Sequence, residues 1–171
     1  MKKIIMIIAF RDFKDEEYFI PKQLFKKSGF IVKTASSEKG TAIGSEGGET
    51  KIDLLLEEIK DFDALVLVGG QGCLKYLDNE KVYQLIQSAH LQEKLIAGIC
   101  IAPVILAKAG ILKQKQATVW NSSLDKSAIK ILKENGAIFE QEFSVVQDNN
   151  IITAPGPSAV KDFAQAIINN L

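Results

Sequence analysis

The chain is poor in residues that mark several common classes of protein. It has two cysteines in 171 residues, too few for the disulfide framework of a small secreted domain. Arg11 is the only arginine, so bidentate clamps for phosphate or carboxylate groups are scarce. Basic and acidic residues both number 21. This zero net charge argues against a nucleic acid or an anionic membrane as partner.

Long apolar runs are also absent. No run approaches the roughly 18–20 residues that cross a membrane. The N-terminal stretch MKKIIMIIAF starts like a signal peptide, but the charged stretch RDFKDEE follows at once, without a small-residue cleavage site. A β-strand is the better interpretation. We therefore expect a cytoplasmic protein that has no contact with membranes.

Short apolar runs alternate with amphipathic stretches along the chain, which predicts strands alternating with helices. Expected strands cover residues 3–10, 30–36, 64–68, 95–99 and 117–120, with a hairpin formed by 143–147 and 151–153. Expected helices cover residues 16–28, 53–59, 80–92, 101–109, 125–135 and 158–169. This order is typical of a single α/β domain, residues 1–171, whose parallel sheet is covered by helices on both faces. Ligands of such sheets bind beyond the carboxyl ends of the strands.

The segment LIAGICIAPVILAKAG carries the clearest chemical signal. A buried strand runs straight into Cys100 and a helix is expected directly after it, so the turn between them must be sharp. This pattern resembles a nucleophile elbow with cysteine in place of serine. A thiol at a helix N-terminus is expected to have a lowered pKa. The alternative is that Cys100 is an unreactive thiol of the core.

The neighbouring strand ends in Gly69-Gly70. A backbone N–H of this turn and that of Ile101 are candidates for an oxyanion hole beside Cys100. The alternative is an ordinary tight turn. The glycines do not fit a dinucleotide-binding fingerprint, because Lys75 stands where its last glycine should be.

Four segments resemble the ThiJ/PfpI family, also called the DJ-one family. They are DEEYFIPKQLFKKSGFIVKTAS, DALVLVGG, AGICIAPVILAKAGIL and TAPGPSAVKDFAQAI, and they spread from residue 15 to residue 167. The resemblance implies a three-layer, flavodoxin-like sandwich related to class I glutamine amidotransferases. The last segment is more similar to the Parkinson-associated deglycase and chaperone branch than to the PfpI protease branch. Members usually pair near the active site, so we expect a homodimer.

The resemblance also implies roles for individual residues. Cys100 matches the family nucleophile, and Glu17, four residues before Pro21, matches the acid that hydrogen-bonds the thiol. Gly70 and Ile101 match the backbone donors. A charged Glu17 would repel a thiolate, whereas a protonated Glu17 would donate a hydrogen bond to it, so the pair works only if Glu17 stays neutral. The alternative is a solvated acid in the first turn of a helix.

The sequence departs from the family at its histidines. The only histidine, His90, lies in the helical stretch VYQLIQSAHLQEK and is read as a residue at the surface or at a helix end. The protease branch has histidine directly after the nucleophile, where this chain has Ile101, and a glutamate where this chain has Leu74. The deglycase branch often has a histidine where this chain has Trp120. A Cys-His dyad therefore cannot be assembled.

We place Gly69, Trp120 and Cys73 in the pocket around Cys100. Trp120 is either a wall of that pocket or part of the core. Cys73 is either a resolving thiol for Cys100 or an ordinary free thiol.

Three functions remain open. The first is a glyoxalase or deglycase that uses Cys100 and Glu17 on a small carbonyl substrate. The second is a thiol that senses oxidants, or a stress chaperone. The third is a cysteine peptidase or amidase. It is the weakest of the three, because the catalytic base that it needs is missing. None of the three requires a metal or a cofactor.

Overall fold

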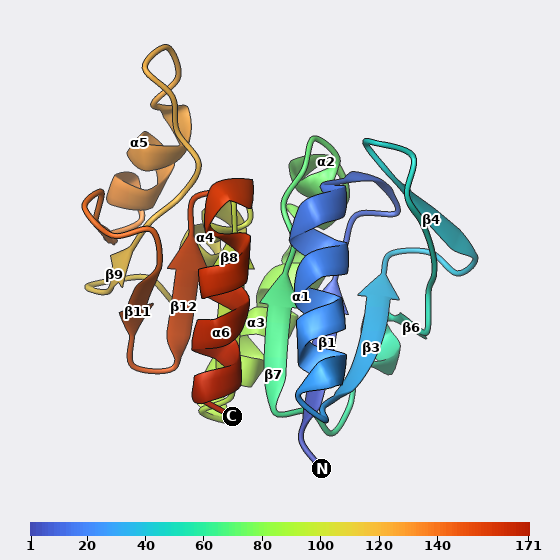
Figure 1. Cartoon of the computed structure of the whole chain (residues 1–171). Coiled ribbons are helices and arrows are strands. Elements are labelled where there is room, and N and C mark those ends of the chain that lie inside the picture. The colour runs from blue at the N-terminus through green and yellow to red at the C-terminus, as the bar shows by residue number, and fades with distance from the viewer.

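The computed structural model describes residues 1–171 as three layers, a central sheet with helices on both faces (Figure 1). The sheet has seven strands in the order β11-β12-β8-β7-β1-β3-β6. All neighbouring pairs are parallel except β11 with β12, which form an antiparallel hairpin at one edge. These strands are β1 (Lys3–Ile7), β3 (Ile31–Ser36), β6 (Leu54–Leu55), β7 (Ala64–Leu67), β8 (Leu95–Ile99), β11 (Val146–Asp148) and β12 (Ile151–Ala154).

The two faces of the sheet are covered by different helices. Successive strand residues point to opposite faces, so Met6 of β1 packs in one apolar cluster and its neighbours Ile5 and Ile7 pack in another. The first cluster contains side chains of α1 (Asp15–Lys27) and α6 (Val160–Asn169), which lie side by side in Figure 1. The second contains side chains of α2 (Cys73–Leu77), α3 (Glu80–Leu91), α4 (Pro103–Lys108) and α5 (Ser127–Glu134).

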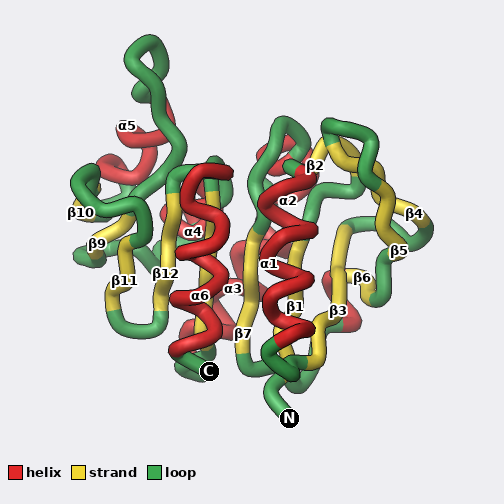
Figure 2. The backbone as a smooth tube through the Cα atoms, viewed as in Figure 1, coloured by secondary structure: helices red, strands yellow, loops and turns green.

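Two small sheets flank the central one, as the strands in Figure 2 show. One consists of β2 (Arg11–Phe13), β4 (Thr41–Gly44) and β5 (Glu49–Lys51), and the other of β9 (Gln116–Ala117) and β10 (Ile138–Phe139). The first small sheet lies next to the start of α1. The carboxyl ends of the central parallel strands face one end of the molecule, and both chain termini lie at the other end (Figure 1).

The predicted fold class is confirmed, but several elements differ from expectation. The stretch 53–59 is not a helix: it forms β6 and a 3₁₀ turn at Leu56–Glu58. Asp53 does not cap a helix, because its carboxylate accepts a hydrogen bond from the Thr34 N–H at 2.8 Å. The helix expected at 101–109 is shorter and begins at Pro103. The sequence did not predict β2, β10 or α2, and the strand expected at 117–120 is only the two-residue β9 at Gln116–Ala117. None of the helices is long and apolar enough to span a membrane.

Candidate active site

Cys100 occupies a sharp turn between β8 and α4. Its φ is +63°, in the left-handed region that non-glycine residues seldom adopt. Two backbone hydrogen bonds hold this conformation: the Cys100 N–H donates to Ala154 O at 2.9 Å, and the Trp120 N–H donates to Cys100 O at 2.8 Å. A strained residue that carries a nucleophile at a strand-to-helix turn is the defining feature of a nucleophile elbow.

Two backbone amides lie close enough to the Cys100 sulfur to lower the pKa of its thiol. They are the N–H of Ile101, the next residue along the chain, and the N–H of Gly70, from the turn after β7. Neither amide donates to a backbone carbonyl. These are the two residues that the sequence analysis named as candidates for an oxyanion hole, and the structure places both beside the sulfur.

The Gly69-Gly70 turn needs glycine at both positions. A Cβ on Gly69 would lie 2.6 Å from the Cys100 Cβ and 2.7 Å from Glu17 Oε2, closer than side-chain atoms approach one another. Gly70 has a φ of +113°, and a Cβ there would lie 2.4 Å from the backbone nitrogen of Lys14. Only glycine allows this turn to pass so close to the thiol.

Glu17 lies in the first turn of α1 and is fully buried. The solvated acid considered from the sequence is therefore not what the fold contains. The Gly69 N–H donates to Glu17 Oε2 at 3.0 Å. The other carboxyl oxygen, Oε1, is buried without a well-aligned partner, and the carboxyl group interacts with the Cys100 thiol.

Burial raises the pKa of Glu17 to about 7, although the hydrogen bonds from the Cys100 thiol and the Gly69 N–H act in the opposite direction. A carboxyl group with this pKa keeps its proton over much of the range below neutrality. Below this pKa Glu17 is neutral, the form in which a carboxyl group can donate a hydrogen bond.

The pKa of Cys100 differs from the sequence expectation. Burial and the neighbouring Glu17 raise it to about 12, and the Ile101 and Gly70 amides lower it less. The expected lowering relied on a helix beginning directly after Cys100, whereas α4 starts three residues later and has six residues. Cys100 and Glu17 form a coupled pair that loses one proton near neutral pH and the second only at high pH.

The pair forms the floor of a cavity of about 540 Å³ beyond the carboxyl ends of β7 and β8. The cavity brings together five of the predicted site residues: Glu17, Gly70, Cys100, Ile101 and Trp120. It is also lined by five residues that the sequence reading did not assign to the pocket: Lys14, Ser45, Gln71, Leu74 and Pro157.

Cys73 and Gly69 do not line the cavity. Gly69 lies beneath the wall, against Cys100 and Glu17. Cys73 is fully buried in the core as the first residue of α2, and burial raises the pKa of its thiol. The sequence placed Cys73 in the pocket, and this prediction is wrong: the residue begins α2 directly after the turn and is buried in the core cluster on that face of the sheet.

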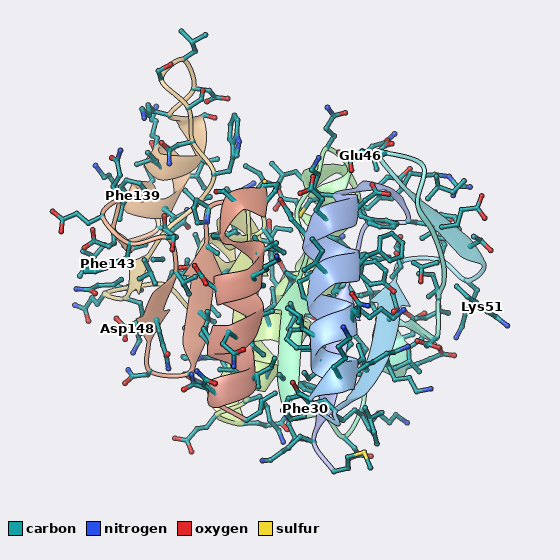
Figure 3. The ribbon with its side chains drawn as sticks, in the orientation of Figure 1. Phe30, Glu46, Lys51, Phe139, Phe143 and Asp148 are labelled. Atoms are coloured by element: carbon teal, nitrogen blue, oxygen red, sulfur yellow. The ribbon has the colours of Figure 1, made fainter.

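The edge of the cavity formed by Ser45 is held by a buried carboxylate. Asp15 accepts hydrogen bonds from the Glu46 N–H at 2.9 Å and the Gly48 N–H at 2.7 Å, which fixes the turn between β4 and β5 to the start of α1. Lys14 forms an ion pair with Glu46, with 2.5 Å between Nζ and Oε1. Figure 3 shows Glu46 near the start of α1. The glycines at positions 44, 47 and 48 are typical of a turn, but nothing in this stretch of sequence indicates that the turn borders the site.

No imidazole lines the cavity. His90 lies in the last turn of α3, and its Nδ1 is buried without a partner. No group of three His, Cys, Asp or Glu side chains is placed to hold a metal ion. Glu17 is therefore the candidate acid–base group of the cavity.

Comparisons with known proteins identify the family of the chain. Residues 2–170 match the DJ-1/PfpI family. The chain is 32% identical to Deglycase PfpI of Pyrococcus furiosus, over 90% of each chain. It is 29% identical to Protein dj-1beta of Drosophila melanogaster, over 100% of this chain and 90% of that one. These two identities are close and do not assign the chain to one branch.

A solved structure gives the same result. A ThiJ/PfpI domain protein from Brachyspira murdochii superposes with a TM-score of 0.91 at 36% identity, over 99% of this chain and 97% of that one. Together with the elbow at Cys100 and the buried Glu17, these matches show that the chain belongs to the DJ-1/PfpI family.

Proposed function

We propose that this protein is a cysteine-dependent enzyme that acts on reactive carbonyl compounds, with Cys100 as nucleophile and Glu17 as the group that moves the proton. One observation carries the proposal: a buried carboxyl group whose pKa is raised to about 7 interacts with a thiol at the floor of a cavity. Relatives that are named deglycase support the same chemistry.

The first step forms a hemithioacetal with a 2-oxoaldehyde. The singly deprotonated pair reacts as a Cys100 thiolate beside a protonated Glu17. The sulfur forms a bond to the aldehyde carbon, the carbonyl π electrons move to the oxygen, and Glu17 gives its proton to that oxygen. The amides of Gly70 and Ile101 are the donors nearest to the developing charge.

The second step is an internal proton transfer. The hydrogen of the former aldehyde carbon leaves as a proton to the Glu17 carboxylate and returns to the neighbouring carbon, while the hydroxyl proton moves to the neighbouring oxygen. The product is a thioester of a 2-hydroxy acid. Water then attacks the thioester, the carbon–sulfur bond breaks, and Cys100 is regenerated. A single acid–base group can serve each of these transfers in turn.

Turnover of methylglyoxal to lactate tests the proposal. We expect wild type to be active, Cys100→Ser to be inactive, and Glu17→Gln to lose at least about a hundredfold in kcat, as is typical for a lost general acid–base group. Cys73→Ala is the matched control, because it removes the thiol that lies in the core, and it should retain activity. Equal activity of Cys100→Ser and wild type would refute the proposal.

A second candidate is a thiol that senses peroxide. The buried Glu17 Oε1 lacks a well-aligned partner and is available to donate its proton to an oxygen on the sulfur. Peroxide would transfer one oxygen to the Cys100 thiolate to give a sulfenic acid and water, and a second to give a sulfinic acid. Under mild peroxide, mass spectrometry should find the gain of two oxygens at Cys100 and not at Cys73. Oxidation of both thiols at one rate would remove this candidate.

Peptidase activity is the weakest of the three functions. The cavity offers no imidazole that could activate the sulfur and then protonate an amine leaving group.

A further inference from the structure

The cavity lining includes several apolar residues, and the largest of them is an aromatic ring. These residues are Leu74, Ile101, Trp120 and Pro157, called here the apolar wall. Trp120, the only tryptophan of the chain, is 36% exposed. A large indole beside a reactive thiol presents a flat surface on which an apolar group of a ligand can pack.

The backbone fixes Trp120 next to the nucleophile. Its N–H donates to the carbonyl oxygen of Cys100 at 2.8 Å, and the preceding residue, Val119, is fully buried in the core. The backbone of Trp120 is therefore held against the elbow by the same hydrogen bond that holds the strained turn, and its side chain lines the cavity.

The cavity is also larger than the simplest substrates need. A volume of about 540 Å³ lies within the roughly 300–1,000 Å³ of pockets that hold drug-sized ligands. Methylglyoxal, with a single methyl group on its ketone carbon, would leave most of this space and the apolar wall uncovered.

The polar side of the cavity does not favour an anionic substituent. Lys14 is the only cationic residue of the lining, and it is already paired with Glu46 at 2.5 Å and lies 3.9 Å from Glu16. An incoming carboxylate would have to compete with these two acids. The uncharged apolar wall is thus the better partner for the rest of the substrate.

We propose that the preferred substrate is a 2-oxoaldehyde that carries an aromatic ring or a comparably flat apolar group, and that Trp120 is the residue that selects it. This inference rests on the proposed function and specifies its substrate class. The aldehyde carbon bonds to the Cys100 sulfur while the ring packs against the indole. Aliphatic 2-oxoaldehydes react by the same steps but gain nothing from this wall.

The ratio of kcat/KM for phenylglyoxal to that for methylglyoxal tests the inference. The ratio for wild type should be well above the ratio of the second-order rate constants with which a free thiol adds to the same two aldehydes. Trp120→Leu should lower the ratio roughly three- to tenfold, the range expected for one lost aromatic contact. Trp120→Phe should keep most of it. Phe143→Leu is the control, because Phe143 is 61% exposed and lies outside the cavity lining, on the flank marked in Figure 3.

A ratio in Trp120→Leu equal to that of wild type would overturn the inference and leave the proposed function intact. If wild type turns over neither aldehyde, the proposed function fails, and a second measurement still tests Trp120. Alkylation of Cys100 by phenacyl bromide and by bromoacetone compares an aromatic with an aliphatic group without any turnover. We expect Trp120→Leu to lose the preference for phenacyl bromide, and an unchanged preference would contradict the role of Trp120.

Discussion

Cys100 and Glu17 hold two protons that leave at very different pH. The first leaves near pH 7, at the raised pKa of Glu17, and the second near pH 12, at the raised pKa of Cys100. Because the groups are coupled, the singly deprotonated pair includes a form with a thiolate and a protonated carboxyl group. The reactivity of Cys100 therefore depends on the loss of the first proton, near pH 7, and not on the loss of the second, near pH 12.

The rate of Cys100 alkylation should consequently rise with pH through an inflection near 7. In Glu17→Gln this inflection should disappear, because the first proton of the pair no longer exists and burial keeps the remaining thiol protonated at neutral pH. Iodoacetamide labelling between pH 5 and 10, followed by mass spectrometry, measures both profiles. An inflection near 7 that survives in Glu17→Gln would show that another group controls the thiol.

Glu17 also makes folding depend on pH. Its pKa rises from 4.5 to about 7 on folding, so between these values the folded chain binds more protons than the unfolded chain. The free energy of unfolding must then fall as pH rises through this window, by about 3 kcal/mol in total. The contribution is fully present below pH 4.5 and lost above pH 7.

Glu17→Gln removes this titration. The free energy of unfolding of the variant, taken relative to that of wild type, should be higher at pH 8 than at pH 5, by an amount on the order of 2 kcal/mol. Urea unfolding at the two pH values measures the gain, and Glu16→Gln, at the exposed neighbouring position, is the matched control. A difference between Glu17→Gln and wild type that is the same at pH 5 and pH 8 would contradict the raised pKa.

At the scale of elements, the cavity edge depends on a contact between two distant segments. Asp15 at the start of α1 accepts the N–H groups of Glu46 and Gly48. Asp15→Ala leaves two donors without their partner and should cost about 2–3 kcal/mol of unfolding free energy. Glu46→Ala removes only the exposed pair with Lys14 and should cost less than about 1 kcal/mol. Similar denaturant midpoints for the two variants would mean that Asp15 does not hold the turn.

The elements that the sequence predicted are the ones with a strong periodic signal. The buried strands at Lys3–Ile7, Ala64–Leu67 and Leu95–Ile99 are largely apolar runs, and a charged residue precedes each of them. The strand β2 and the helix α2 have three and five residues, which is too short for a period to appear. Their positions depend on long-range pairing, such as β2 with β4.

The site was predictable where chemistry depends on local sequence. Cys100 and Ile101 followed from a strand that runs into a turn. The choice of Gly70 within the Gly69-Gly70 turn followed from a family resemblance, as did Glu17, because its burial has no local signal. The burial of Cys73 was not predictable, since one residue of difference in a tight turn reverses the side-chain direction. The raised pKa of Cys100 was missed because desolvation is a property of the folded chain.

At the scale of the whole molecule, we expect a homodimer. The expectation comes from the family, and the zero net charge adds no repulsion between copies. Light scattering at micromolar concentration should give about twice the 18.8 kDa of one chain. A mass of one chain at that concentration would contradict the prediction.

Both chain termini lie at the end of the sheet opposite to the carboxyl ends of β7 and β8, as Figure 1 shows. A purification tag, a fluorescent protein or an immobilising linker joined to either terminus would therefore leave the molecule on the side away from Cys100. Surface-attached protein can then present its reactive thiol to solution, so one immobilised preparation can be exposed to a series of electrophiles in turn.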